Sequence, residues 1–356
     1  MKFFNVDLHI SIIADMRKIF TDLGHQVDDW SLSDHTWVFN RERANIPLLD
    51  GNKWRTMTPK DMSDKFYAQY KDELSGYDGF IVTYPPPFAL LFKHFNKPII
   101  INNPIRYEWP FSFRKEDWEY FNEFLREGLD NGQIILVANN IYDQKYMEGF
   151  IGRDVQHIPS ICDYYGEYYE PTKDDFIYYS KGKMNEIGAS NIKHKDEVFK
   201  GSHRHKDLTE FKGIIHFPYQ ISYMSIFEQY TANIPLFVPT KDFLIRLYKK
   251  GYQGILKEIC WNGEFNIGGK SIIPFNGKYD PNDYKNFDAV YEWLQYADFY
   301  DANWMPHILQ FQSFAHLEHL VAETNVSEVS DNMKTFNKFR KELIYNMWDN
   351  LIKNKI

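Results

Sequence analysis

The sequence predicts an α/β protein of two domains, each built on a parallel sheet. Strand-like and helix-like segments alternate through the first half, beginning with residues 2–6, 11–24 and 25–32. Strands that alternate with helices imply right-handed crossovers, and therefore parallel strands. The chain has 356 residues, which is more than one hydrophobic core usually holds. A tyrosine-rich stretch without a clear period, residues 160–174, is the expected hinge.

The predicted elements follow in a regular order. The apolar segment 2–6 is expected as a strand, 11–24 as an amphipathic helix that ends at Gly24, and 25–32 as the next strand. The alternation then continues through helix MSDKFYAQYKDEL, strand YDGFIVTY, helix FALLFKHF, strand KPIIIN, helix EDWEYFNEFLREGL and strand QIILVAN. The second half opens with a strand at 175–180 and becomes mostly helical after GIIHF and PLFVP.

Composition excludes several classes of protein. With 44% hydrophobic and 18% aromatic residues the chain is not disordered, and a formal charge of -8 lacks the positive field of a nucleic-acid binder. Two cysteines, Cys162 and Cys260, predict neither a disulfide framework nor a cysteine-based zinc site, which fits a reducing compartment. Asp7 and His9 interrupt any signal peptide, and no apolar run reaches ~18 residues. We expect a soluble, cytoplasmic protein.

One segment of the second half carries a functional pattern. In GIIHFPYQISYMSIFEQYTANIPLFVPT (213–240), a short apolar run leads through polar residues into a helical turn with a single carboxylate, Glu228. A second apolar run follows within a few residues, so Glu228 is expected on a helix between two strands. This arrangement typically holds a ligand.

This segment resembles the donor site of GT-B-fold glycosyltransferases, especially of the retaining type. That family has two glutamates separated by seven residues, the second of which binds the ribose hydroxyls of the nucleotide. Glu228 matches the second glutamate, whereas Gln220 stands in place of the first. Pro235 matches the proline of the family's Gly-x-Pro, whereas Asn233 stands in place of its glycine. Asparagine is the other residue that tolerates the left-handed conformation of a helix end, so this departure is mild. An amide binds sugar hydroxyls but supplies no negative charge, so the retaining or inverting outcome stays open.

The resemblance implies the architecture and the reaction. It implies two Rossmann-like domains of GT-B type with a central cleft: an acceptor-side domain at 1–165, a nucleotide-sugar domain at 166–325, and a C-terminal helix at 326–356 that crosses back to the first domain. A hexosyltransferase-like enzyme of this kind moves a sugar from a nucleotide-diphosphate sugar to a glycan or other hydroxyl acceptor. It uses no metal and no separate cofactor.

A nucleotide-sugar site also needs groups that bind the diphosphate. Ser222 and Ser225 come at the start of the Glu228 helix, where they would meet phosphate or serve only as helix caps. Lys181 follows the first strand of the second half, and Arg204 lies in the basic stretch 193–207. We expect Lys181, with Arg204 as a helper, to neutralise the diphosphate; a solvated surface role is the alternative for Lys181. The histidines of that stretch lack a zinc-binding pattern.

Polar residues directly after the first two strands suggest an acid–base site. Asp7 and His9 follow the first strand, and Asp34 follows the second. An inverting enzyme needs a base for the acceptor proton, and His9, oriented by Asp7 or Asp34, would provide it. In a retaining enzyme the departing phosphate would take the proton, and these residues would then only cap the next helix.

Further residues at the same sheet edge are candidates for binding the acceptor. His35 and Trp37 follow the second strand, and Arg106 and Glu108 follow the fourth. Aromatic rings stack on sugars, and the charged groups would bind hydroxyls.

Two other functions remain open from sequence. The same architecture would suit a sugar-nucleotide epimerase, which needs a water-activating carboxylate and no acceptor groove. A non-catalytic carbohydrate-binding or scaffold protein is the alternative outside the enzymes, and Gln220 is compatible with it.

Overall fold

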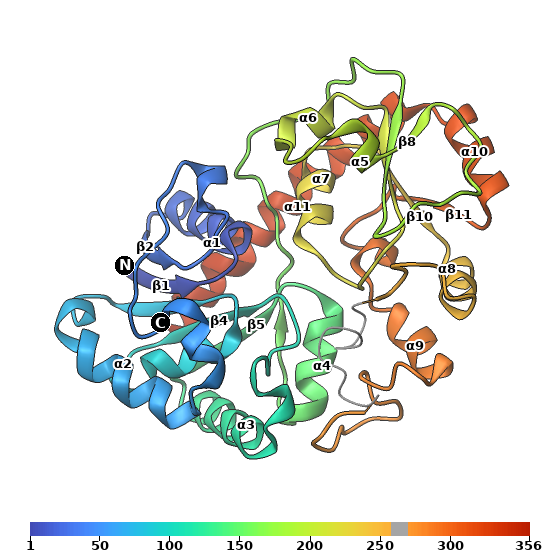
Figure 1. Ribbon diagram of the computed structural model, residues 1–356. Coiled ribbons are helices and arrows are strands. Elements are labelled where there is room, and N and C mark those ends of the chain that lie inside the picture. The colour runs from blue at the N-terminus through green and yellow to red at the C-terminus, as the bar shows by residue number, and fades with distance from the viewer. Residues whose placement is uncertain (258–269) are drawn as a thin grey trace. The chain divides into compact units, whose positions relative to one another are not determined.

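The computed structural model describes residues 1–257 and 270–356, which form two compact units (Figure 1). Unit 1 consists of Met1–Ser160, Ser271–Lys278 and Ile344–Ile356, and unit 2 of Ile161–Lys270 and Tyr279–Leu343. The chain passes from unit 1 to unit 2 after Ser160, five residues before the position expected from the sequence. Cys260 lies outside the described residues.

Unit 1 contains a parallel sheet of six strands in the order β2-β1-β3-β4-β5-β6. The strands are β1 (Lys2–Asp7), β2 (Gln26–Ser31), β3 (Gly79–Val82), β4 (Ile99–Asn103), β5 (Ile134–Ala138) and β6 (Gln156–His157). β3, β4 and β5 are buried along their whole length. Continuous apolar runs of this kind are typical of parallel strands that are covered on both faces.

The helices of unit 1 occupy the connections between these strands. They are α1 (Ile10–Asp22), α2 (Pro59–Leu74), α3 (Lys115–Asp130), α4 (Ile141–Ile151), and the 3₁₀ helices η1 (Thr36–Phe39), η2 (Asp50–Thr56), η3 (Pro86–Phe95) and η4 (Phe111–Phe113). Thr58 and Asn140 cap α2 and α4 by accepting backbone N–H groups. The segment FALLFKHF, expected as an α-helix, lies within η3, which begins with consecutive prolines at 86 and 87.

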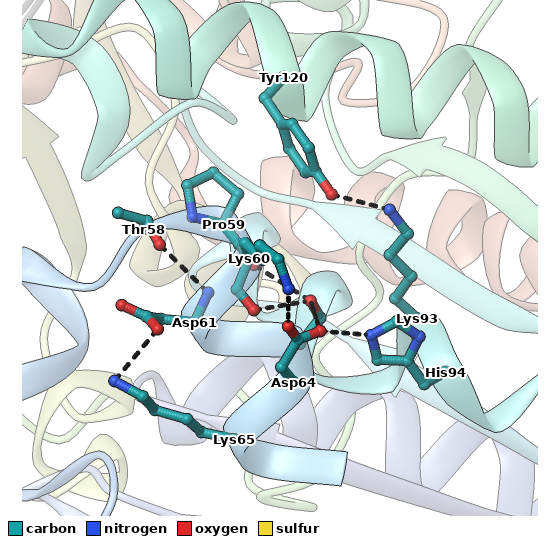
Figure 2. A network of polar contacts seen from close by, with 10 residues as sticks. Thr58, Pro59, Lys60, Asp61, Asp64, Lys65, Lys93, His94 and Tyr120 are labelled. Carbon is teal, nitrogen blue, oxygen red and sulfur yellow. Dashed lines mark hydrogen bonds and ion pairs between the residues drawn. The ribbon is translucent and has the colours of Figure 1, made fainter. Parts of the chain in front are cut away.

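Polar contacts fasten α2 to its neighbours on the surface of unit 1 (Figure 2). Asp64 of α2 accepts a hydrogen bond from Lys60 and lies 2.8 Å from Nε2 of His94 in η3. The hydrogen bond from Lys60, followed by the contact with His94, lowers the pKa of Asp64 to about 2. Lys93, also in η3, donates to the hydroxyl of Tyr120 in α3 at 2.8 Å. The three elements are thus linked by side chains as well as by their apolar faces.

Unit 2 repeats the strand arrangement with five parallel strands in the order β11-β10-β9-β7-β8. The strands are β7 (Phe176–Tyr179), β8 (Ile192–His194), β9 (Gly213–His216), β10 (Leu236–Pro239) and β11 (Leu309–Phe311). Its helices are α5 (Lys195–Val198), α6 (His205–Thr209), α7 (Met224–Thr231), α8 (Lys241–Lys249), α9 (Phe287–Leu294), η5 (Asp298–Tyr300), α10 (Phe314–Glu323) and α11 (Val326–Lys355). In both units the second strand lies outside the first, and the third, fourth and fifth follow on the other side. The predicted fold class, two Rossmann-like units with parallel sheets, is confirmed.

The C-terminal helix α11 contributes to both units. Its residues up to Leu343 belong to unit 2 and those from Ile344 belong to unit 1. In unit 1, Trp348 is buried and packs edge-on against Phe20 of α1, with ring centroids 5.7 Å apart. Among the described residues, no helix combines the length and the apolar character needed to span a membrane.

A close backbone approach marks the start of the third strand in unit 1. Gly79 opens β3 and lies opposite Phe3 of β1. The N–H of Phe80 donates to the carbonyl of Pro98, just before β4, at 2.9 Å. Two residues before this proline, Asn96 has a left-handed backbone with φ 52°. A Cβ atom on Gly79 would lie 3.1 Å from the Pro98 carbonyl oxygen, so a glycine allows this contact.

The same arrangement recurs in unit 2. Gly213 opens β9 and lies opposite Phe176 of β7, and the N–H of Ile214 donates to the carbonyl of Pro235 at 2.9 Å. Asn233, two residues before this proline, has φ 62°. An Asn-x-Pro sequence therefore ends the helix or loop before the fourth strand in both units. The left-handed conformation expected for Asn233 is present.

We predict that Gly213→Ala lowers the free energy of unfolding by about 1–3 kcal/mol, as overpacking does in a tight core. The added Cβ would lie 2.9 Å from the Pro235 carbonyl oxygen and 3.0 Å from the ring of Phe237. Gly79→Ala should cost less, because its closest contact is 3.1 Å. Urea unfolding followed by circular dichroism measures both. Gly76→Ala is the control, since nothing lies within 4 Å of its added Cβ; equal effects of all three variants would contradict the packing argument.

Candidate functional site

The edge of the unit 2 sheet contains a topological switch point between β7 and β9. The chain leaves β7 toward β8 on one side, whereas β9 lies on the other, and ligands of open parallel sheets bind at such a point. Lys181 follows β7, and Tyr219 follows β9. The Lys181 Nζ atom lies 4.4 Å from the centroid of the Tyr219 ring. The structure thus brings the predicted phosphate-binding lysine to the switch point.

Gln220 lies in the same loop as Tyr219, beyond the end of β9. Its side chain is half-buried, and its Nε2 atom lies 3.5 Å from the hydroxyl of Tyr219. Because Lys181 contacts the ring of the same tyrosine, the amide and the cation border a common aromatic side chain.

Glu228 is carried on α7, the helix that follows this loop (Figure 1). The residue is half-buried, and its carboxylate accepts a hydrogen bond from the hydroxyl of Tyr164. Burial, and next the negative charge of Glu228, raise the pKa of the hydroxyls of Tyr164, Tyr165 and Tyr179. Tyr179 ends β7, so the carboxylate acts electrostatically on the C-terminal end of this strand. Glu228 therefore belongs to the same sheet edge as Lys181.

The two candidate serines occupy different places at the start of α7. Tyr223 is the residue that precedes the helix, and its side chain makes no capping hydrogen bond. Ser222 donates to Asp298 of η5 at 2.5 Å, whereas Ser225 is the second residue of the helix and is half-buried. Ser225 thus lies among the free N–H groups of the first turn, where an anion would be stabilised.

Histidines surround this edge of unit 2. The His205 ring is stacked on Tyr165 with centroids 4.4 Å apart, and the His216 Nε2 atom lies 2.6 Å from Oε1 of Gln229. Burial lowers the pKa of both histidines to about 4, so both are neutral at pH 7.

Arg204, the predicted second cation, is exposed directly before α6. The neighbouring His203 has its Nε2 atom 3.0 Å from the Tyr179 hydroxyl. Within the described ranges there is no group of three side chains suited to hold a metal ion.

The turn after α7 is held by α11. Ser330 donates to the carbonyl of Asn233 at 2.8 Å, and Nδ2 of Asn337 donates to the side-chain oxygen of Asn233 at 2.9 Å. Asn337 also donates to the carbonyl of Tyr230 at 2.8 Å. The helix that carries Glu228 is therefore fixed at its C-terminal end by side chains about 100 residues away in the sequence.

In unit 1, Asp7 ends β1 in a fully buried position. It accepts a hydrogen bond from Ser31 of β2 at 3.3 Å, and its Oδ2 atom has no partner among the described residues. Burial, and next the charge of Asp29, raise the pKa of Asp7 to about 8. Asp7 is therefore largely protonated at neutral pH.

His9 lies two residues further on, directly before α1. Its ring faces Tyr84, beyond the end of β3, with centroids 6.0 Å apart. Its buried Nδ1 atom has no hydrogen-bond partner outside residue 9 in the described part of the chain. Burial, with a smaller contribution from the charge of His35, lowers the pKa of His9 to about 4. The backbone N–H of His9 donates to the Asp7 carboxylate, but the expected hydrogen bond from the His9 ring to Asp7 or Asp34 is not formed between these residues.

The loop after β2 presents the remaining predicted residues to solvent. The Asp34 carboxylate is exposed and lies 3.3 Å from the guanidinium group of Arg43. His35 is exposed, and Trp37 is 56% exposed on η1. Of these three, His35 is the one that influences His9 electrostatically.

Arg106 and Glu108 lie in the interior of unit 1. Arg106 is 4% exposed and Glu108 is fully buried. Glu108 accepts hydrogen bonds from Tyr146 at 2.9 Å and from Ser112 at 3.3 Å. Arg106 lowers the pKa of Asp143, but burial outweighs this effect and raises it to about 6. These contacts stabilise the loop after β4, and nothing in their geometry presents either side chain to an acceptor.

Sequence reasoning did not identify several residues of the unit 2 site. Tyr164 and Tyr165 lie in the stretch expected as a hinge, where their only signal in the sequence is the run of tyrosines itself. His216 and Gln229 pair across 13 residues, and Asn337 reaches Asn233 across 104. No local pattern reveals such long-range pairs.

The chain has been compared with known proteins. No protein-family model and no curated protein sequence matches it. Among solved structures, the spinosyn forosaminyltransferase SpnP is similar over 100% of this chain and 99% of its own, with 9% identity and a TM-score of 0.47. The glycosyltransferase SnogD from Streptomyces nogalater covers the same shares with 11% identity and a TM-score of 0.45. A putative UDP-N-acetylglucosamine 2-epimerase from Listeria monocytogenes matches 67% of this chain and 78% of its own, with 9% identity and a TM-score of 0.41. With every score below 0.5, the function has to be argued from this chain's own residues.

We predict that Asp7→Asn changes the pH dependence of stability. The folded pKa of about 8 exceeds the ordinary 3.8, so the contribution of Asp7 is full below about pH 4 and is lost as the pH rises through 8. The Asp7→Asn variant has no titrating group at this position, so its stability does not fall with pH for this reason. Its free energy of unfolding relative to the native sequence should increase by on the order of 4 kcal/mol between pH 5 and pH 8, because this range spans three pH units below the folded pKa and each unit corresponds to 1.36 kcal/mol.

Urea unfolding of both proteins at the two pH values measures the difference. Because all other groups are shared, their titration cancels in the comparison. A constant difference would show that Asp7 is ionised in the folded protein across this range.

Proposed function

We propose that this protein is a glycosyltransferase that takes a sugar from a nucleotide-diphosphate sugar and transfers it to a hydroxyl acceptor. The observation that carries the proposal is the position of Glu228. It lies on the helix after β9, acts electrostatically on the end of β7, and is followed by the left-handed Asn233 before β10. This is the context in which the resembling family binds ribose with its second glutamate.

The groups around Glu228 suit a nucleotide diphosphate. A carboxylate accepts hydrogen bonds from ribose hydroxyls, and Lys181 at the same sheet edge supplies a cation for phosphate. Ser225 lies in the first turn of α7, where backbone N–H groups point outward. Arg204 is exposed near the end of β7 and is proposed as a second cation. Ser222 is engaged by Asp298 and is proposed to position the loop that carries Gln220.

The proposed acceptor side is the edge of the unit 1 sheet. His9 is neutral at pH 7 and is the proposed base, because an unprotonated imidazole accepts the proton of an attacking hydroxyl. His35 and Trp37 are exposed on the neighbouring loop and are proposed to contact the acceptor. The raised pKa of Asp7 favours its neutral form at pH 7, so we propose Asp34 as the anionic partner of His9.

An assay for sugar transfer tests the proposal as a whole. Purified protein is incubated with a panel of nucleotide-diphosphate sugars, with and without hydroxyl acceptors, and the release of nucleoside diphosphate is measured. Release that requires an acceptor supports a transferase. An isomerised sugar nucleotide without an acceptor would indicate an epimerase, and binding without turnover of any donor would indicate a carbohydrate-binding protein.

We predict that Glu228→Ala weakens binding of a nucleoside diphosphate by about 1.5–3 kcal/mol, the range for a hydrogen bond to a charged group. Isothermal titration of the native and variant proteins measures it. The 2′,3′-dideoxy form of the same nucleotide should bind both proteins equally, because it lacks the hydroxyls that Glu228 accepts from.

Glu292→Ala removes an exposed carboxylate from the same unit and should leave nucleotide binding unchanged. Equal losses for the ordinary and the dideoxy nucleotide would assign Glu228 a structural role through Tyr164 instead.

For His9→Ala we expect turnover to fall by about 10²- to 10⁴-fold with nearly unchanged donor affinity, as for the loss of a general base. The product should then show inversion at the anomeric carbon, which proton NMR detects from the anomeric coupling. The acid limb of the pH–rate profile should lie below the ordinary histidine value of 6.5, because burial lowers the pKa of His9 to about 4.

The matched control is His319→Ala, which removes an exposed histidine from α10. A product that retains the donor configuration, formed by a still active His9→Ala enzyme, would contradict the base assignment and favour proton transfer to the departing phosphate.

A further inference from the structure

Unit 2 contains a cavity away from the switch point. Its volume is about 440 Å³, within the range of small-molecule sites. Residues from the segment that follows the unit boundary, from the end of α7 and from the first half of α11 line it. This cavity therefore lies at the Asn233 end of α7, where the chain enters β10.

The walls of the cavity combine an apolar side with a cationic side. Ile161, Tyr168 and Pro171 contribute apolar and aromatic surface. Lys334 and Lys338, one turn apart on α11, also line the cavity and have no ion-pair partner among the described residues. Two unpaired lysines beside an apolar wall suit a ligand with an apolar body and an anionic group.

The remaining charges of the cavity leave a net positive charge. Lys341 is paired with Asp163, which also accepts a hydrogen bond from the Tyr168 hydroxyl at 3.0 Å. Asp331 is the remaining carboxylate of the lining and offsets one of the two unpaired lysines. One positive charge is left over, so a singly charged anion is favoured over a diphosphate.

A buried hydrogen-bond acceptor, the side-chain oxygen of Asn337, adds a third requirement for the ligand. Asn337 lines the cavity and is 9% exposed, and its Oδ1 atom has no hydrogen-bond partner among the described residues. Its amide orientation is fixed, because Nδ2 donates to Tyr230 and to Asn233. An unsatisfied buried acceptor is unfavourable, and a ligand with an N–H or O–H donor would remove this cost.

We propose that this cavity is a binding site for a small amphipathic anion with an apolar or aromatic body, one negative charge and a hydrogen-bond donor. The charge lies against Lys334 and Lys338, the body against Ile161 and Tyr168, and the donor against Asn337. The site is separate from the switch point that carries Lys181.

Occupancy of this site is coupled to Glu228, a step that rests on the proposed function. Asp163, in the cavity wall, directly precedes Tyr164, whose hydroxyl donates to Glu228. A ligand anion beside Lys334 and Lys338 also attracts Lys341 of the same helix, which is paired with Asp163, and so alters the position of Asp163 and of the adjoining Tyr164. Coupling between two sites is reciprocal, so nucleotide binding alters the affinity of this cavity by the same factor.

Fluorescence titration with 8-anilinonaphthalene-1-sulfonate tests the site, because this probe has an aromatic body, one sulfonate and an N–H donor. We expect saturable binding of one probe per chain. The double variant Lys334→Glu, Lys338→Glu should weaken binding at least 10-fold, since it replaces both cations with anions. Ser327→Trp, at the exposed rim, should also abolish binding by filling the cavity without changing its charge.

Lys355→Glu is the matched control, an exposed lysine of the same helix outside the cavity. Thermal unfolding of each variant confirms that it is folded. Probe binding that is not saturable, or that responds equally to the double variant and to Lys355→Glu, would overturn the site.

The coupling is tested by isothermal titration of uridine, thymidine and guanosine diphosphates with and without saturating probe. We expect at least a threefold change in nucleotide affinity in the native protein and none in the double variant. An unchanged affinity would overturn the coupling. If none of the nucleotides binds, the proposed function fails, whereas the result of the probe titration stands by itself.

Discussion

The close approach of the third and fourth strands is the constraint on which both units depend. In each sheet a glycine at the start of the third strand lets a proline carbonyl come within hydrogen-bonding distance of the next N–H group. A side chain there would separate the strands or displace the phenylalanine on the first strand. The left-handed asparagine before the proline then turns the chain so that the carbonyl points at the third strand. Glycine allows the close approach, asparagine adopts the left-handed conformation more readily than other residues with a Cβ atom, and proline restricts φ.

In unit 2 this constraint also places the proposed nucleotide site. Asn233 lies two residues after α7 and three before β10, so the strand contact fixes the C-terminal end of α7. Ser330 and Asn337 of α11 hold the same turn. Glu228 lies only five residues before Asn233, and it is fixed from the other side by Tyr164. Because its helix is fixed by α11 and its carboxylate is hydrogen-bonded by Tyr164, Glu228 loses little conformational freedom when it binds a ligand. This preorganisation contributes to affinity.

The features that can be predicted from the sequence are those that depend on residues close to one another along the chain. Alternating apolar runs gave the strands, and the chemistry of asparagine gave the left-handed turn at Asn233. Arg106 and Glu108 show the limit of such reasoning, because their position after β4 resembles that of ligand-binding residues. The hydroxyl of Tyr146, 38 residues further along the chain, binds Glu108 and makes it part of the core. The repeated Asn-x-Pro at 96–98 and 233–235 is likewise not predictable from sequence. The two copies share only two residues, and their common role depends on the glycine of the neighbouring strand, which is distant in the sequence.

At the unit 1 sheet edge, burial suppresses both charges that an acid–base pair would use. Asp7 remains protonated and His9 remains neutral at pH 7. A neutral imidazole accepts a proton, but its lowered pKa makes it a weak base until something stabilises the imidazolium. The Nδ1 atom has no partner outside residue 9 within the described chain, so a bound acceptor or a repositioned Asp34 would have to supply that hydrogen bond. Base strength would then rise only in the acceptor complex. In the proposed transferase such a dependence would protect a bound donor from water, because a water molecule that enters without an acceptor would meet a base too weak to activate it.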